Sequence, residues 1–189
     1  MELIRPVQAS EAAAIRHVLL VAFPTAAEAD LVQRLREGGK AVIELVAMDG
    51  DTVVGHVVFS PIALEPLAGT VGLGLGPLAV VPDHEKHGVG RRLVQNGLAA
   101  CHQWGAGFVV VIGDPPYYTR FGFEPAAKHG LRDEYGAGDA FMVFKLESGA
   151  LPPSGTLVKY SPEFSELAVK PAPAAVSRKA RRPARPPRG

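Results

Sequence analysis

An apolar strand, a glycine turn and an amphipathic helix follow one another directly, and this succession constrains the fold more than any other feature of the sequence. The strand ends at Val81, a short charged turn leads to the step Gly88-Val89-Gly90, and the helix runs on through Arg91. The first amides of a helix have no partner within it, and the helix dipole places roughly half a positive charge there. Glycine has no Cβ atom to keep a phosphate oxygen away. The sequence therefore predicts a phosphate or pyrophosphate site at this turn.

Hydrophobic periodicity predicts an α/β layer fold with a sheet of mixed strand direction. Asp49-Gly50-Asp51 separates two β-rich runs, which is typical of a hairpin. The continuous apolar run 108–112 predicts a strand covered on both faces, and the unit 78–112 should form a right-handed parallel crossover. The expected strands are 3–7, 41–48, 52–61, 70–81, 108–112 and 140–146, and the expected helices are 11–23, 28–37 and 88–104.

Length and composition exclude several classes of protein. A chain of 189 residues that is 47% hydrophobic is long enough for one well-buried domain. No apolar run approaches the roughly 18–20 residues of a membrane span. The first residues lack the layout of a signal peptide. Because Cys101 is the single cysteine and cannot form an internal disulfide, we expect a cytoplasmic protein.

Charge is distributed unevenly along the chain. Residues 171–189 carry six basic and no acidic side chains, whereas residues 1–170 carry 14 basic and 19 acidic ones. The basic segment is rich in proline and alanine and has little to bury, so we expect a disordered tail, with at most weak contacts to nucleic acid or an acidic partner. We therefore divide the chain into a domain at 1–147, an extension at 148–170 that adds a strand or packs over a cleft, and the tail at 171–189.

Two motifs in this order resemble the GNAT superfamily of acyl-CoA-dependent N-acetyltransferases. The first is Val80-Val81-Pro82, followed after four residues by His87-Gly88-Val89-Gly90-Arg91, and the second is Tyr118-Thr119-Arg120-Phe121-Gly122-Phe123. One helix and one strand separate the motifs, and residues 113–123 are similar to a group of small bacterial GNAT proteins. The resemblance covers about residues 1–147. It implies an α/β fold with a mixed central sheet of six to seven strands, helices on both faces, and a splay between the fourth and fifth strands.

The resemblance also implies acetyl-CoA as co-substrate and no metal. The splayed strand would pair with the pantetheine arm through the backbone of Leu78, Ala79 and Val80. The pyrophosphate would be held mainly by backbone N–H groups, of Lys86, His87, Gly88, Val89, Gly90 and Arg91. Glu85 departs from the family pattern, which has Gln or Arg there. His84 and His87 lack a third ligand nearby, so we expect them to face solvent.

Within this resemblance, Tyr118 is the expected general acid, which would donate a proton to the thiolate of CoA. The general base is less evident, and the available carboxylates are Asp114 and Glu65. Asp114 has a second interpretation as the cap of a short helix that begins at Pro115. The alternation Gly72, Gly74, Gly76 also has two interpretations, either room for substrate or a weakened strand with a bulge.

The predicted function is transfer of an acetyl group from acetyl-CoA to a primary amine of a small molecule or peptide, by direct attack in a ternary complex of a monomer or homodimer. Two alternatives remain, a non-catalytic CoA-binding or regulatory module and an interaction protein that acts through its basic tail. A dinucleotide-binding Rossmann domain is disfavoured. Its glycines open the first βα turn, whereas here they follow four predicted strands and the third glycine is missing.

Overall fold

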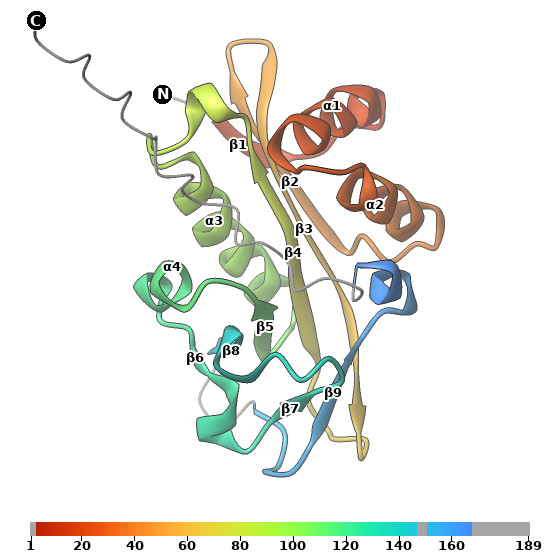
Figure 1. Cartoon of the computed structure of the whole chain (residues 1–189), viewed down its shortest axis with the longest axis vertical. Helices are drawn as coiled ribbons and strands as arrows, with labels where there is room; N and C mark the ends of the chain where they lie inside the picture. The colour runs from red at the N-terminus through yellow and green to blue at the C-terminus, as the bar shows by residue number, and fades with distance from the viewer. Residues whose placement is uncertain (1–2, 147–150, 168–189) are drawn as a thin grey trace, which may run out of the picture.

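A sheet of nine strands organises the residues described by this computed structural model, 3–146 and 151–167 (Figure 1). The main strand order is β1-β2-β3-β4-β5-β8-β6, while β9 pairs with β3 and β7 pairs with β9. The strands are β1 (Leu3–Pro6), β2 (Ile43–Asp49), β3 (Thr52–Glu65), β4 (Gly72–Val80), β5 (Phe108–Ile112), β6 (Glu124–Pro125), β7 (Arg132–Asp133), β8 (Phe141–Lys145) and β9 (Leu157–Tyr160). The helices are α1 (Ala12–Ala22), α2 (Ala27–Glu37), α3 (Val89–Trp104) and α4 (Pro115–Tyr118), with 3₁₀ turns at Ala9–Glu11, Pro82–His84, Thr119–Phe121, Ala126–His129, Gly138–Ala140 and Pro162–Glu166.

The mixed sheet with helices on both faces agrees with the prediction. The described residues form nine strands rather than six or seven, because β6 and β7 are two residues long and β9 lies in the predicted extension. The hairpin is confirmed, since Asp49 of β2 pairs with Thr52 of β3. Within these same residues no helix is long and apolar enough to cross a membrane.

The helices cover opposite faces of the sheet, with α1 and α2 on one side and α3 on the other (Figure 1). Alternate residues of a strand point to opposite faces, so each face has its own apolar cluster. On the α1–α2 face, Ile15 and Leu31 pack with sheet residues such as Val110. On the α3 face, Leu93 packs with residues such as Phe59.

The two parallel strands β4 and β5 separate soon after they meet. Pairing is confined to Gly72–Gly74 against Phe108–Val110, although β4 continues to Val80. A bulge follows the pairing, since Val57 opposes Leu78 while Phe59 opposes Leu75. The splay predicted between the fourth and fifth strands is therefore present, and it leaves one edge of β4 open beyond its third residue.

The predicted extension contributes to the fold over its described residues. Strand β9 pairs with the end of β3, Ile62 opposing Tyr160, and the turn Pro162–Glu166 lies next to α2. Residues 151–167 thus belong to the same sheet structure as the preceding chain. The expected basic tail, 171–189, lies outside the described residues.

Candidate active site

The loop between β4 and α3 has the geometry expected of an anion cradle. Gly88 takes φ = 81° just before the first turn of α3, and Lys86 takes φ = 64°. None of the six amides from Lys86 to Arg91 donates to a backbone oxygen of the described residues. Val89 is buried against the α3 face, while the side chains of Lys86, His87 and Arg91 are exposed. The loop therefore presents consecutive free N–H groups beside cationic side chains.

The structure also shows the contacts of Glu85 and His84, which lie just before the cradle. Glu85 is exposed and forms no ion pair within the described residues. Its carboxylate is thus free to turn toward solvent and away from a bound phosphate. His84 contacts Asp49, with 3.1 Å between Nε2 and Oδ2. Across residues 3–146 and 151–167, no group of three potential metal ligands occurs.

The open edge of β4 leads from the cradle into the sheet. Between Leu75 and Val80 this strand has β3 on one side only, so the backbone groups directed toward β5 have no strand partner. The edge includes the three residues expected to pair with pantetheine, of which Ala79 is buried and Leu78 and Val80 are half-buried. An extended chain with alternating donors and acceptors fits such an edge.

Tyr118 lies in α4, directly after β5. Its ring packs against the backbone of Gly113, since a Cβ atom on Gly113 would lie 2.4 Å from ring atom Cε2. The ring also contacts Tyr117 and Phe123 edge-on, with centroid distances of 5.0 Å and 5.5 Å. Burial raises the pKa of Tyr118, with smaller contributions from Tyr117 and Asp114. The phenol therefore keeps its proton at neutral pH.

Tyr117, which the sequence predicts to point away from Tyr118 and to pack or line the substrate cleft, lies at the cradle. A Cβ atom on Gly90 would lie 2.7 Å from the hydroxyl oxygen of Tyr117. The guanidinium of Arg120 stacks 4.6 Å above the Tyr117 ring centroid. Because Tyr117 and Tyr118 are consecutive residues of one helical turn, their side chains diverge, and α4 thereby joins the cradle to the predicted acid. The adjacency of two tyrosines was the available signal.

The two candidate bases differ in their contacts. The backbone oxygen of Asp114 accepts the amides of Tyr117 and Tyr118 at 3.0 Å and 3.1 Å, but the side chain makes no cap bond. The carboxylate thus forms no hydrogen bond within the described residues. Glu65, in contrast, binds Lys159 at 2.6 Å near the end of β3. Of the two, only Asp114 has an unengaged carboxylate.

The glycines of β4 do not leave an empty space for substrate at two of the three positions. A Cβ atom on Gly72 would lie 2.3 Å from Cζ of Phe108, and one on Gly74 would lie 2.8 Å from Cε1 of Tyr160. Aromatic rings occupy the space that these glycines provide. Gly76 takes φ = 139° at the bulge, so here the bulge interpretation is correct.

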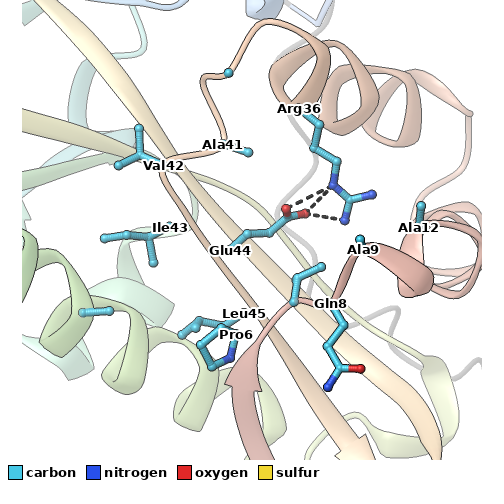
Figure 2. A pocket seen from close by; sticks show the side chains of 13 residues that line it. Pro6, Gln8, Ala9, Ala12, Arg36, Ala41, Val42, Ile43, Glu44 and Leu45 are labelled. Carbon is cyan, nitrogen blue, oxygen red and sulfur yellow. Dashed lines mark hydrogen bonds and ion pairs between the residues drawn. The ribbon is translucent and has the colours of Figure 1, made fainter.

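A separate cavity of about 580 Å³ lies at the start of β2. Figure 2 shows Arg36 and Glu44 pointing toward each other in it, and Gln8 and Ala9 are also among its lining residues. Its lining includes no residue of the cradle or of α4. Since β2 and β4 are separated by β3, this cavity is distinct from the open edge of β4.

Comparison with known proteins defines the class. Residues 3–126 match the family described as the acetyltransferase (GNAT) domain. The chain is 39% identical over 159 residues to the uncharacterised N-acetyltransferase YhbS of Escherichia coli strain K12, covering 83% of this chain and 95% of YhbS. A crystal structure of YhbS from Escherichia coli in complex with CoA is similar with a TM-score of 0.81 at 38% identity, covering 86% of this chain and 91% of that one. A GNAT-family acetyltransferase from Brucella melitensis in complex with acetyl-CoA has a TM-score of 0.73 at 29% identity, covering 87% and 99%.

The fold and the matches together place the protein among the acyl-CoA-dependent N-acetyltransferases. The chain belongs to the GNAT superfamily. The family and the class of enzyme predicted from the two motifs are therefore confirmed.

Proposed function

We propose that this protein transfers the acetyl group of acetyl-CoA to a primary amine by direct attack in a ternary complex. The observation that carries the proposal is the open edge of β4, which begins at the free amides of the cradle and passes into the gap beside β5. Similar structures from Escherichia coli and Brucella melitensis hold CoA and acetyl-CoA. The overall folds are similar, with TM-scores of 0.81 and 0.73, which supports a similar mode of binding.

Each part of the site has a role in this reaction. The amides from Lys86 to Arg91 bind the pyrophosphate, and the backbone of Leu78, Ala79 and Val80 pairs with the pantetheine arm. The amine nitrogen attacks the thioester carbonyl, the carbon–sulfur bond breaks, and the sulfur takes the proton of the Tyr118 hydroxyl. That hydroxyl forms no hydrogen bond within the described residues, so it is available to the leaving group. Holding both reactants in one gap supplies much of the rate enhancement.

The amine must lose a proton during transfer, and Asp114 is our candidate for the group that receives it. Its carboxylate is unengaged, and Asp114 is the N-cap residue of the short helix that ends at Tyr118. A base and an acid close to the same thioester are what acyl transfer requires.

The decisive experiment combines acetyl-CoA binding with release of free thiol in the presence of a panel of primary amines. We expect Tyr118→Phe to keep acetyl-CoA affinity and to lower kcat by about 10²–10⁴-fold. Binding without amine-dependent thiol release in the wild-type protein would instead indicate a non-catalytic CoA-binding module. Deletion of 171–189 tests the remaining alternative, because an interaction protein that acts through its basic tail would lose its binding activity.

A further inference from the structure

The ring of Tyr160 lies over the point where β4 and β5 separate. Tyr160 is the last residue of β9 and pairs with Ile62 of β3. Its ring reaches across β3 to β4, since a Cβ atom on Gly74 would lie 2.8 Å from Cε1 and 3.0 Å from Cδ1. Gly74 is the final β4 residue that pairs with β5. The ring therefore covers the closed end of the gap into which the acetyl group must reach.

Two hydroxyls are buried without partners at this end of the gap. Tyr160 is 7% exposed and Ser60 is 0% exposed, and the hydroxyl oxygen of each has no hydrogen-bond partner within the described residues. Ser60 lies directly opposite Gly74 and points to the α1–α2 face, because its neighbour Phe59 points to the α3 face. Buried hydroxyls are nearly always hydrogen-bonded, so each of these two needs a partner that the described residues do not supply.

Tyr160 and Tyr118 approach the gap from opposite faces of the sheet. Tyr160 belongs to the apolar cluster of the α1–α2 face, whereas Tyr118 and the cradle residue Val89 belong to the cluster of the α3 face. Burial raises the pKa of Tyr160, and Asp133 and Tyr118 add to this effect, so the Tyr160 hydroxyl keeps its proton. The cradle lies on the α3 face. An acceptor amine that enters from the α1–α2 face would therefore approach the thioester from the opposite side of the sheet.

Negative charge surrounds Tyr160 on this face. Glu134 accepts the backbone N–H of Tyr160 at 2.8 Å, and Asp133 accepts the amides of Tyr135 and Ala137. The ring of Tyr135 lies 6.2 Å from that of Tyr160. Neither carboxylate forms an ion pair within the described residues. Uncompensated carboxylates beside neutral hydroxyls favour a cation and disfavour the phosphates of CoA.

We propose that the hydroxyls of Tyr160 and Ser60, with the carboxylates of Asp133 and Glu134 beside them, form the binding subsite for the amino group of the acceptor. This inference rests on the proposed function. The two carboxylates attract the acceptor as an ammonium ion, which loses one proton to solvent as it enters the subsite. The neutral amine then attacks the thioester and passes its second proton to Asp114. Both hydroxyls accept hydrogen bonds from the nitrogen and orient it toward the gap. The substrate class is thus a cationic primary amine.

Stability of the free protein gives a test that does not depend on activity. Tyr160→Phe and Ser60→Ala each remove a hydroxyl that has no partner, so we expect each to raise the melting temperature by about 2–4 °C. The matched control is Ser161→Ala. Ser161 is buried beside Tyr160, but its hydroxyl donates to the backbone oxygen of Pro61 at 2.9 Å. We expect this control to lower the melting temperature, and a decrease for Tyr160→Phe as well would overturn the inference.

Amine binding and transfer give the second readout, with putrescine and a lysine-containing peptide as cationic probes and an aromatic amine as the neutral probe. We expect Tyr160→Phe to keep acetyl-CoA affinity, to raise the KM for the cationic probes at least tenfold, and to abolish the thermal shift caused by putrescine in the presence of CoA. Glu134→Gln should move the preference toward the neutral amine. Ser161→Ala should leave the KM unchanged.

The two proposals fail in different ways. If the wild-type protein binds acetyl-CoA but releases no thiol with any amine, the proposed function fails, and the putrescine thermal shift still decides the subsite. If the wild-type protein transfers acetyl groups and Tyr160→Phe has the same KM, the subsite is wrong. A loss of acetyl-CoA affinity in Tyr160→Phe would also overturn it, because the hydroxyl would then contact the thioester.

Discussion

The imidazole Nε2 of His56 lies 2.6 Å from the carboxylate Oε1 of Glu44. The same carboxylate also binds the guanidinium of Arg36. Arg36 donates to both oxygens of Glu44, through Nε at 3.0 Å and Nη2 at 2.6 Å (Figure 2). His56 is fully buried, and its Nδ1 has no partner among the described residues. The ring is therefore neutral, with its proton on Nε2 and directed at the carboxylate.

From the contacts among His56, Glu44 and Arg36 we predict that acid destabilises the protein. Burial lowers the pKa of His56 below 6.5, although the contact with Glu44 opposes this effect. Burial would raise the pKa of Glu44, but hydrogen bonds from His56 and Arg36 outweigh it and lower the pKa below 4.5. In both cases the unfolded chain binds protons before the folded protein does, so the free energy of unfolding falls as pH falls. The loss from His56 begins near pH 6.5, and that from Glu44 near pH 4.5.

His56→Gln tests the source of this dependence, because glutamine keeps an N–H donor for Glu44 and does not titrate. We expect the free energy of unfolding, measured by chemical denaturation, to depend less on pH between about pH 7 and about pH 5 than in the wild-type protein. The exposed His17→Gln is the matched control and should keep the wild-type slope. An unchanged slope in His56→Gln would assign the acid sensitivity to other groups.

Helix α3 contains a glycine that packing requires. A Cβ atom on Gly97 would lie 2.4 Å from Cε2 and Cζ of Phe59, which is fully buried. Alanine would gain about 1 kcal/mol of helix propensity, but the clash with a fixed ring typically costs about 1–3 kcal/mol and more at such short distances. We expect Gly97→Ala to lower the free energy of unfolding by about 1–3 kcal/mol. The matched control is Ala99→Gly at an exposed position of α3, which changes helix propensity without a clash. It should lower the free energy of unfolding by about 1 kcal/mol. An increase in stability for Gly97→Ala would contradict the packing account.

The contact between Gly90 and Tyr117 predicts coupling between α3 and α4. Gly90→Ala places a methyl group against the Tyr117 hydroxyl, and we expect a loss of about 1–3 kcal/mol in stability. It should also weaken acetyl-CoA binding, because the methyl group lies in the first turn of α3. Tyr117→Phe removes the clashing oxygen, so the double variant should recover about 0.5–2 kcal/mol relative to the sum of the single changes. Strict additivity in this double-mutant cycle would refute the contact.

Local sequence patterns were sufficient to predict much of the fold, and they underlie the proposed cofactor side of the site. The hairpin at Gly50, the glycine turn at Gly88 and the apolar strand β5 each depend on neighbouring residues, and the structure has them where the sequence indicated. The cradle and Tyr118 belong to contiguous motifs that attach to these elements. Short-range signals therefore carry the proposed cofactor side of the site.

The proposed acceptor side was not predictable in the same way. Tyr160 meets Gly74 only because β9 pairs with the end of a long β3. Glu134 accepts the amide of Tyr160 because it directly follows β7, a two-residue strand that is too short to have a periodicity of its own. The glycines of β4 had two interpretations in the sequence, room for substrate or a weakened strand with a bulge, and the rings beside Gly72 and Gly74 come from Phe108 and Tyr160, in distant parts of the chain. Such contacts follow from tertiary packing and leave little trace in any single segment.

The position of the Tyr118 ring depends on Gly113, and this dependence gives a prediction that changes no catalytic group. A Cβ atom on Gly113 would lie 2.4 Å from Cε2 and 2.9 Å from Cδ2 of Tyr118. The ring cannot stay in place, and a displacement of about 1 Å at a reacting group typically costs about 10²-fold in rate. We expect Gly113→Ala to lower kcat by about one to two orders of magnitude while acetyl-CoA affinity, measured by calorimetry, changes little. Gly69→Ala is the matched control, because a Cβ atom there has no neighbour within 4 Å. Wild-type kcat in Gly113→Ala would mean that the placement of the Tyr118 phenol is unimportant for the reaction, and would remove Tyr118 as the general acid.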